Sequence, residues 1–127
     1  MNLQKVLFAF FIMLALTLNF GFVMGEINNP SHHHVYELFA ALVVSLIATV
    51  MKFGDRTHMG AVLLAASLVA DLQLIAAAVV WGISVRVMEI ELGTGVMSSI
   101  VSLSGGAVVA NVISVVLLII ETVQARR

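Results

Sequence analysis

Four long stretches of apolar residues alternate with short polar links along the chain. None shows the regular polar and apolar alternation that a membrane barrel strand shows over about ten residues. Each comes close to the roughly 20 residues that a helix needs to cross about 30 Å of hydrocarbon. We predict an all-α fold: residues 1–127 form one four-helix transmembrane domain, an up-down bundle with spans at Val6–Met24, Tyr36–Phe53, Met59–Ile83 and Val96–Ile120.

The main alternative interpretations concern the first two predicted spans. The apolar run of the second covers only Leu38 to Met51, so it becomes long enough only if Lys52 ends it by extending its ammonium to the interface. The first span could instead be a signal peptide cleaved after Gly25. Its apolar run exceeds the roughly 7–15 residues of a signal peptide, so we favour an uncleaved span.

Lysines and arginines near the span ends predict the orientation, because they favour the cytoplasmic side. Arg86 alone lies in a link on the opposite side from the termini. The others lie on the side of the termini: Lys5, Lys52, Arg56, Arg126 and Arg127. We therefore expect a multi-pass protein of the bacterial inner membrane, with both termini inside.

The composition narrows the classes of partner and chemistry. Of the 127 residues 61% are hydrophobic and only 10% charged, which makes the lipid bilayer the expected surroundings. A net charge of -1 with six Lys and Arg provides no basic stripe for nucleic acid. The absence of Cys excludes thiolate chemistry, and no catalytic triad or facing pair of haem-ligating histidines is visible. We expect no cofactor and a non-enzymatic protein.

Small residues recur every four positions in the fourth span, at Ser102, Gly106 and Ala110. Rows of this kind let two helices approach closely in lipid. They predict helix packing, and with the short links they favour a homo-oligomer or a larger membrane-protein partner.

Asp71 is the most informative residue, since it lies near the centre of the third span. An ionised carboxylate at that depth is costly and usually faces a partner, a cavity or water. No Lys, Arg or His lies inside any span, so the chain offers it no evident counter-charge. Asn19, Ser67 and Asn111 are candidates to join Asp71 in one polar cluster. Two interpretations stay open: an interhelical hydrogen-bond clamp, or a site for a proton or cation.

A histidine cluster precedes the second span. His32, His33 and His34 lie close to Glu37 in sequence, and imidazole binds transition metals and titrates near neutral pH. This pattern indicates a metal or pH sensor on the periplasmic side. The alternative is that these side chains simply lie in the lipid head-group zone.

Several segments give the chain a resemblance to known sequences. They are Leu14–Phe22, Asn29–Ala40, Lys52–Thr57, Ser67–Ala77 and Val101–Asn111. In these the chain resembles an uncharacterised family of short four-span inner-membrane proteins from Gram-negative bacteria. The resemblance implies a four-helix membrane protein and supplies no activity.

Three functions remain as hypotheses. The first is a self-associating or accessory component of a cation-transport system, with Asp71 as its buried polar focus. The second is an oligomeric cation or proton pathway that uses Asp71. The third is the sensor formed by the histidine cluster.

Overall fold

The computed structural model describes residues 3–24, 35–84 and 94–125, and these contain four helices and no strand. The helices are α1 (Leu3–Val23), α2 (Val35–Lys52), α3 (His58–Gly82) and α4 (Thr94–Ala125). All four are long and apolar enough to cross a membrane. The prediction of four apolar helices is therefore confirmed, and α4 extends furthest beyond its predicted bounds.

The turn between α2 and α3 is built from local hydrogen bonds. The Asp55 backbone N–H donates to the Lys52 carbonyl at 3.1 Å, just after α2 ends. Thr57 then caps α3: its backbone is extended, and its hydroxyl accepts from the Gly60 N–H at 2.9 Å. A side-chain acceptor at this position satisfies an N–H that the first turn of a helix leaves free. The Thr57 cap thus sets the residue at which α3 begins.

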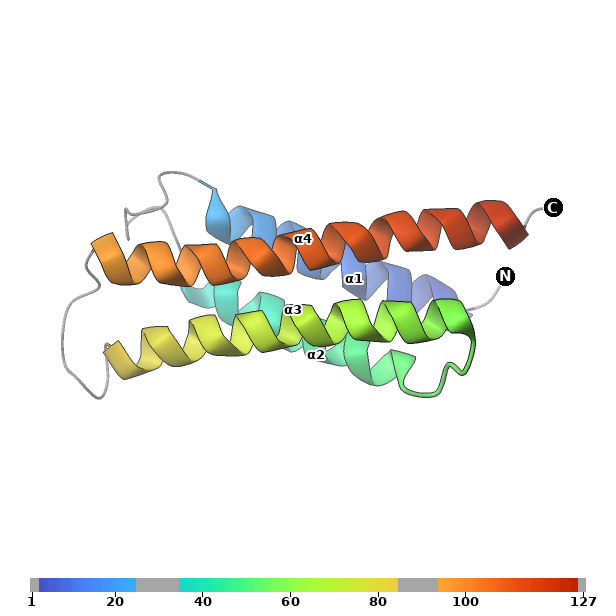
Figure 1. Ribbon diagram of the computed structural model, residues 1–127, viewed down its shortest axis with the longest axis horizontal. Helices are drawn as coiled ribbons and strands as arrows, with labels where there is room; N and C mark the ends of the chain where they lie inside the picture. The colour runs from blue at the N-terminus through green and yellow to red at the C-terminus, as the bar shows by residue number, and fades with distance from the viewer. Residues whose placement is uncertain (1–2, 25–34, 85–93, 126–127) are drawn as a thin grey trace.

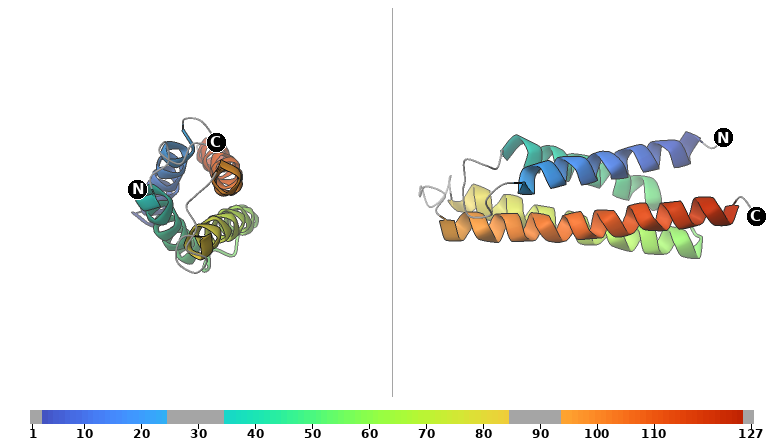
Figure 2. Two further views of the ribbon diagram at one scale, coloured as in Figure 1. Left: turned by 90° about the vertical axis from the view of Figure 1, so that its left-hand side faces the viewer. Right: turned by 90° about the horizontal axis from the view of Figure 1, so that it is seen from above.

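The helices form a ring in which neighbours in sequence are also neighbours in space, and α4 closes the ring against α1 (Figures 1 and 2). The chain runs up and down alternately. The start of α1, the α2–α3 turn and the end of α4 consequently lie together, at what we call the terminal end of the bundle (Figure 1). The far end holds the end of α1 and the start of α4.

Apolar side chains cover the outside of the bundle as well as its core. Leu72 on α3 is 69% exposed and Val50 on α2 is 67% exposed. Inside, an apolar cluster towards the far end includes Phe22 and Met97, and another towards the terminal end includes Phe8. An apolar exterior of this kind suits contact with lipid rather than water.

The predicted row of small residues on α4 lies only partly inside the bundle. Side-chain atoms of Gln73 on α3 occupy the space where a Cβ on Gly106 would lie, so this glycine allows close packing of the two helices. Ala110 is buried, whereas Ser102 is exposed. Steps of four residues rotate by about 40° relative to a full turn, so such a row winds around the helix and cannot face one neighbour throughout.

Candidate ion-binding site in the bundle core

Asp71 lies near the middle of α3, about 20 Å from the first residue of the helix at 1.5 Å per residue. Its side chain faces the core and the residue is 5% exposed. In that helix Ser67 and Leu74, one turn away on either side, are fully buried as well. The carboxyl group is therefore enclosed by the bundle.

Two hydroxyl groups from α2 hold the Asp71 carboxyl. The Ser45 hydroxyl lies 2.6 Å from Oδ1, and the Thr49 hydroxyl lies 2.5 Å from Oδ2. Because the two residues are four apart, they share one face of α2 and reach both carboxyl oxygens together. The Thr49 hydroxyl also lies 2.9 Å from the backbone carbonyl oxygen of Ser45. The carboxyl is thus bonded on both oxygens within one chain.

No positive charge accompanies this carboxyl among the described residues. The ion pairs there are Lys5 with Glu121 and Lys52 with Asp55, and neither involves Asp71. A buried carboxylate without a counter-ion is costly in a low-dielectric core. The described residues supply Asp71 with no ion-pair partner, and the absence of a counter-charge from the whole chain stays a prediction.

Asn19, also predicted for the polar cluster, bonds elsewhere. It is fully buried on α1, and its Oδ1 accepts from the Ser104 hydroxyl of α4 at 2.6 Å. Its Nδ2 has no hydrogen-bond partner among the described residues. Asn19 therefore ties α1 to α4, on the opposite side of the ring from the α2–α3 contact that holds Asp71.

Ser67 and Asn111 complete the predicted set, and both are buried. In the part of the chain that the structure describes, the Ser67 hydroxyl and the Asn111 Nδ2 have no hydrogen-bond partner, and the buried Ser114 hydroxyl on α4 has none either. All four predicted residues are thus buried, but Asp71 and Asn19 form separate hydrogen-bonded groups rather than one joined cluster.

Three residues of these groups were not predicted: Ser45, Thr49 and Ser104. Small hydroxyl residues are common in membrane helices, where they often bond to their own backbone. The spacing of Ser45 and Thr49 in an otherwise apolar span was the available signal. Their alignment with Asp71 depends on how α2 rotates against α3, which hydropathy does not report.

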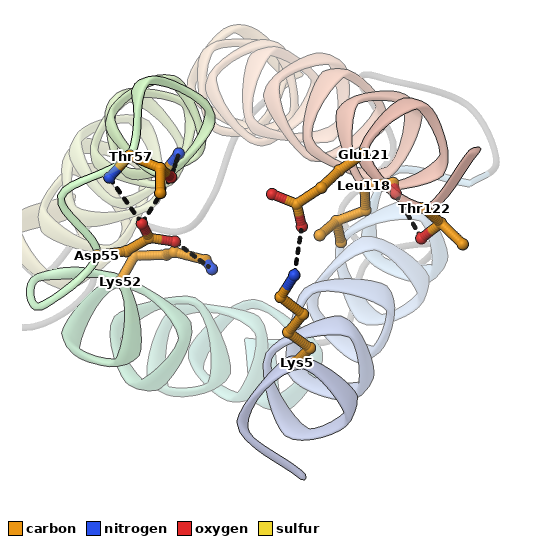
Figure 3. A network of polar contacts seen from close by, with 8 residues as sticks. Lys5, Lys52, Asp55, Thr57, Leu118, Glu121 and Thr122 are labelled. Carbon is orange, nitrogen blue, oxygen red and sulfur yellow. Dashed lines mark hydrogen bonds and ion pairs between the residues drawn. The ribbon is translucent and has the colours of Figure 1, made fainter. Parts of the chain in front are cut away.

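A second polar group closes the terminal end of the bundle (Figure 3). The Lys52 ammonium lies 3.3 Å from Asp55 Oδ2 and 4.3 Å from the centre of the Phe8 ring. Across the end, the Lys5 ammonium lies 3.8 Å from Glu121 Oε1. A hollow of about 320 Å³ between these groups is lined by Gln4, Lys5, Phe8, Met51, Lys52, Gly54 and Asp55.

Asp55 is bonded far more strongly than a free surface carboxylate. The Thr57 hydroxyl donates to its Oδ1 at 2.6 Å, and the Thr57 backbone N–H does so at 2.9 Å. The hydroxyl first, then the backbone N–H, and more weakly Lys52 lower the pKa of Asp55 from 3.8 to about 2. Donors that favour the charged form have this effect. Asp55 therefore carries its charge throughout the physiological pH range.

The comparisons with known proteins add a family. The model of DUF6394, a family of unknown function, matches residues 32–122, which is more than half of the chain. The chain belongs to this family. Comparison with curated proteins gives no match, and comparison with solved structures gives none either. The expectation of an uncharacterised family is confirmed, while a Gram-negative origin stays a prediction.

The DUF6394 match includes the whole Asp71 group. Ser45, Thr49 and Asp71 all lie between residues 32 and 122, as do Asp55 and Thr57. Asn19 and the rest of α1 lie outside the matched range. The family match thus spans the elements that position the carboxyl but not the first helix of the ring.

The predicted metal ligands His32, His33 and His34 lie outside the described residues. Glu37 is described, in the first turn of α2, and its carboxylate occupies the space beside Gly21 of α1 where a Cβ would lie. Within the described ranges no group of three or more metal-binding side chains comes together. The sensor therefore stays a prediction from the sequence.

Proposed function

We propose that this DUF6394 protein is a non-enzymatic membrane component of a cation-transport system, and that it conducts a proton or a small monovalent cation through a binding site at Asp71. The observation that carries the proposal is the buried carboxyl with a hydroxyl on each oxygen and, among the described residues, no ion-pair partner. A group with these properties at mid-span is suited to reversible neutralisation by a mobile ion. A helix clamp alone would not require an acid.

The same proposal includes the topology. We place the protein in a bacterial inner membrane with the terminal end of the bundle on the cytoplasmic side. The excess of Lys and Arg at that end supports this orientation. The apolar exterior of the described helices supports insertion in lipid. In this arrangement Asp71 lies near the middle of the bilayer.

A single chain supplies both hydroxyl partners of Asp71, so the proposed site does not need an oligomer. Self-association remains the alternative expectation for how the protein acts. Its test is the mass of the protein purified in mild detergent. A strict monomer would remove the oligomeric pathway and leave the Asp71 site within one chain.

Ion flux tests the proposal. The purified protein is reconstituted in liposomes, and movement of protons and of monovalent cations is measured for the wild type, Asp71→Asn and Glu37→Gln. Glu37→Gln is the matched control, because it makes the same change from a carboxylate to an amide in the first turn of α2, away from Asp71. We expect flux in the wild type and the control and none in Asp71→Asn. Flux unchanged by Asp71→Asn, or absent from the wild type, would refute the proposal.

A further inference from the structure

We infer that the ion held by Asp71 is a proton, and that it exchanges with water at the terminal end along the polar face of α2. This inference rests on the proposed function and goes beyond it, since it names the ion and the side of access.

The number of available hydrogens identifies the ion. Three oxygen pairs lie within hydrogen-bonding distance: Ser45 Oγ with Asp71 Oδ1 at 2.6 Å, Thr49 Oγ1 with Asp71 Oδ2 at 2.5 Å, and Thr49 Oγ1 with the Ser45 carbonyl at 2.9 Å. Each pair needs one hydrogen, and the two hydroxyls supply only two. A proton on Asp71 Oδ2 supplies the third. Oδ2 then donates to Thr49, and Thr49 donates to the Ser45 carbonyl.

A metal cation fits this arrangement less well. It would need the oxygen lone pairs of Ser45 and Thr49 as ligands. In the observed geometry the Ser45 hydroxyl donates to the carboxyl instead, and the Thr49 hydroxyl is shared between the carboxyl and its own helix. Binding a metal ion would break these hydrogen bonds. Binding a proton completes them.

The charged groups of the surrounding helices all lie near helix ends. In the described chain these are Lys5 on α1, Glu37 and Lys52 on α2, His58 on α3 and Glu121 on α4. None forms an ion pair or a hydrogen bond with Asp71. The described chain thus supplies no cation to pair with the Asp71 carboxyl.

The two sides of Asp71 along the bundle differ in polarity. Towards the terminal end, α2 presents Thr49 and then Lys52, both buried. Towards the far end, the same face of α2 presents Ala41 and Leu38, both fully buried. On α3, where Ala70 is buried beside Asp71, the buried residue one turn away is Ser67 on the terminal side and Leu74 on the far side. A proton can pass along hydroxyl groups and water, but not through an apolar layer.

The polar face of α2 ends at the hollow of about 320 Å³ at the terminal end. Lys52, one turn beyond Thr49, lines this hollow and lies over the Phe8 ring. Its ammonium pairs with Asp55, which also lines the hollow. The hollow thus presents polar groups at the end of the polar face of α2, where a proton can exchange with water.

The first experiment tests the identity of the ion. Infrared spectra of the protein in liposomes are recorded for the wild type and Asp71→Asn, with and without sodium. We expect a protonated-acid carbonyl band that disappears in Asp71→Asn, persists in sodium, and accompanies proton flux. No such band, or sodium flux that needs Asp71 at constant pH, would overturn the inference and leave the proposed function standing. Flux of every ion unchanged by Asp71→Asn would instead refute the proposed function.

Hydroxyl variants test the relay. Thr49→Val should slow proton flux about tenfold or more, because the loss of a hydrogen bond worth about 1.4 kcal/mol is a factor of ten. Thr49→Ser keeps the hydroxyl and should keep the flux. Thr122→Val is the matched control, since the exposed Thr122 hydroxyl bonds only to the Leu118 carbonyl, at 2.8 Å. Equal flux in Thr49→Val and Thr122→Val would overturn the inference.

The side of access is tested separately, using the absence of native Cys. Thr49→Cys and Ala41→Cys place one thiol on either side of Ser45 on the same face of α2. A small membrane-impermeant thiol reagent is applied to vesicles of known orientation. We expect labelling of Thr49→Cys from the terminal end only, and none of Ala41→Cys. Labelling of Ala41→Cys alone, or of neither, would overturn the proposed access route.

Discussion

Two aspartates of this molecule are held by threonine hydroxyls in opposite surroundings. Asp55, in the turn at the terminal end, accepts from a hydroxyl and a backbone N–H of Thr57 and pairs with the Lys52 ammonium. Among the described residues Asp71, in the core, meets only the hydroxyls of Ser45 and Thr49. The partners of Asp55 thus include a backbone N–H and an ammonium, which stabilise a negative charge, whereas the described partners of Asp71 carry no charge.

The two carboxyls differ in the kind of hydrogen-bond donor around them more than in the number of hydrogen bonds. A backbone N–H and an ammonium can only donate, so they hold Asp55 in its charged form. A hydroxyl can donate or accept, so the groups around Asp71 do not require a charged carboxyl. The surface carboxyl is therefore held in its charged form, whereas the hydroxyl partners of the buried carboxyl impose no charge on it.

The largest effect should follow from removing both hydroxyls from the buried site. In Ser45→Ala/Thr49→Val the Asp71 carboxyl stays in the core without a partner, which we expect to destabilise the bundle by about 2–4 kcal/mol. Unfolding in mild detergent, followed by helical circular dichroism, measures the loss. The double variant Thr17→Val/Thr122→Val removes two exposed hydroxyls that bond only to their own helix. A similar loss in that control would contradict the special role of the buried pair.

A smaller effect is expected at the surface site. Thr57→Val removes the cap of α3 and one hydroxyl donor to Asp55, and we expect it to lower the free energy of unfolding by about 1 kcal/mol. Thr57→Ser keeps both hydrogen bonds and should stay close to the wild type. The same detergent unfolding assay compares the two. If Thr57→Val and Thr57→Ser had the same free energy of unfolding, the cap would contribute nothing to stability.

Asn19 tests whether a buried polar side chain stabilises the bundle when its hydrogen bonds are incomplete. Asn19 has one satisfied oxygen and an Nδ2 without a partner. Asn19→Leu removes the unpaired donor together with one hydrogen bond, so we expect stability to change by less than about 1 kcal/mol. A loss as large as that of the double hydroxyl variant would mean that Asn19, rather than the Asp71 group, dominates the core.

The smallest effect is the acid response of Asp55. Its pKa falls from 3.8 to about 2 on folding, so its contribution to stability is complete above pH 3.8 and is lost as the pH falls towards 2. Asp55→Asn should remove this response from the pH profile of unfolding. Since Thr57 lowers the pKa more than Lys52 does, Thr57→Val should move the response to higher pH than Lys52→Met. The reverse order would contradict the geometry.

Hydropathy predicted most of the fold. The four apolar helices follow from apolar length alone, and the doubtful second one is a helix that ends at Lys52. The Lys52 ammonium, which was expected to extend to the membrane interface, is buried over the Phe8 ring and pairs with Asp55. The sequence did not predict how far α4 continues. Polar residues such as Glu121 and Thr122 lower its hydropathy near the end, yet a helix can continue on its backbone hydrogen bonds after its side chains become polar.

The candidate site was predicted in part. Asp71 stands out because a carboxyl in an apolar span is rare, and its burial needs no knowledge of the neighbouring helices. Its partners depend on which faces of α2 and α3 meet. The sequence likewise does not show which face of α1 meets α4. Asn19 was expected to join Asp71 and bonds to Ser104 instead.

The helices of the ring differ greatly in length. α2 has 18 residues and α4 has 32, which at 1.5 Å per residue corresponds to about 27 Å and about 48 Å. In a bilayer with a hydrocarbon thickness of about 30 Å, α2 barely matches and α4 must tilt or protrude. The lipid beside α2 would have to thin while α4 remains covered. Acyl chains of different length would therefore strain the α2 side of the ring first, which is the side that holds Asp71.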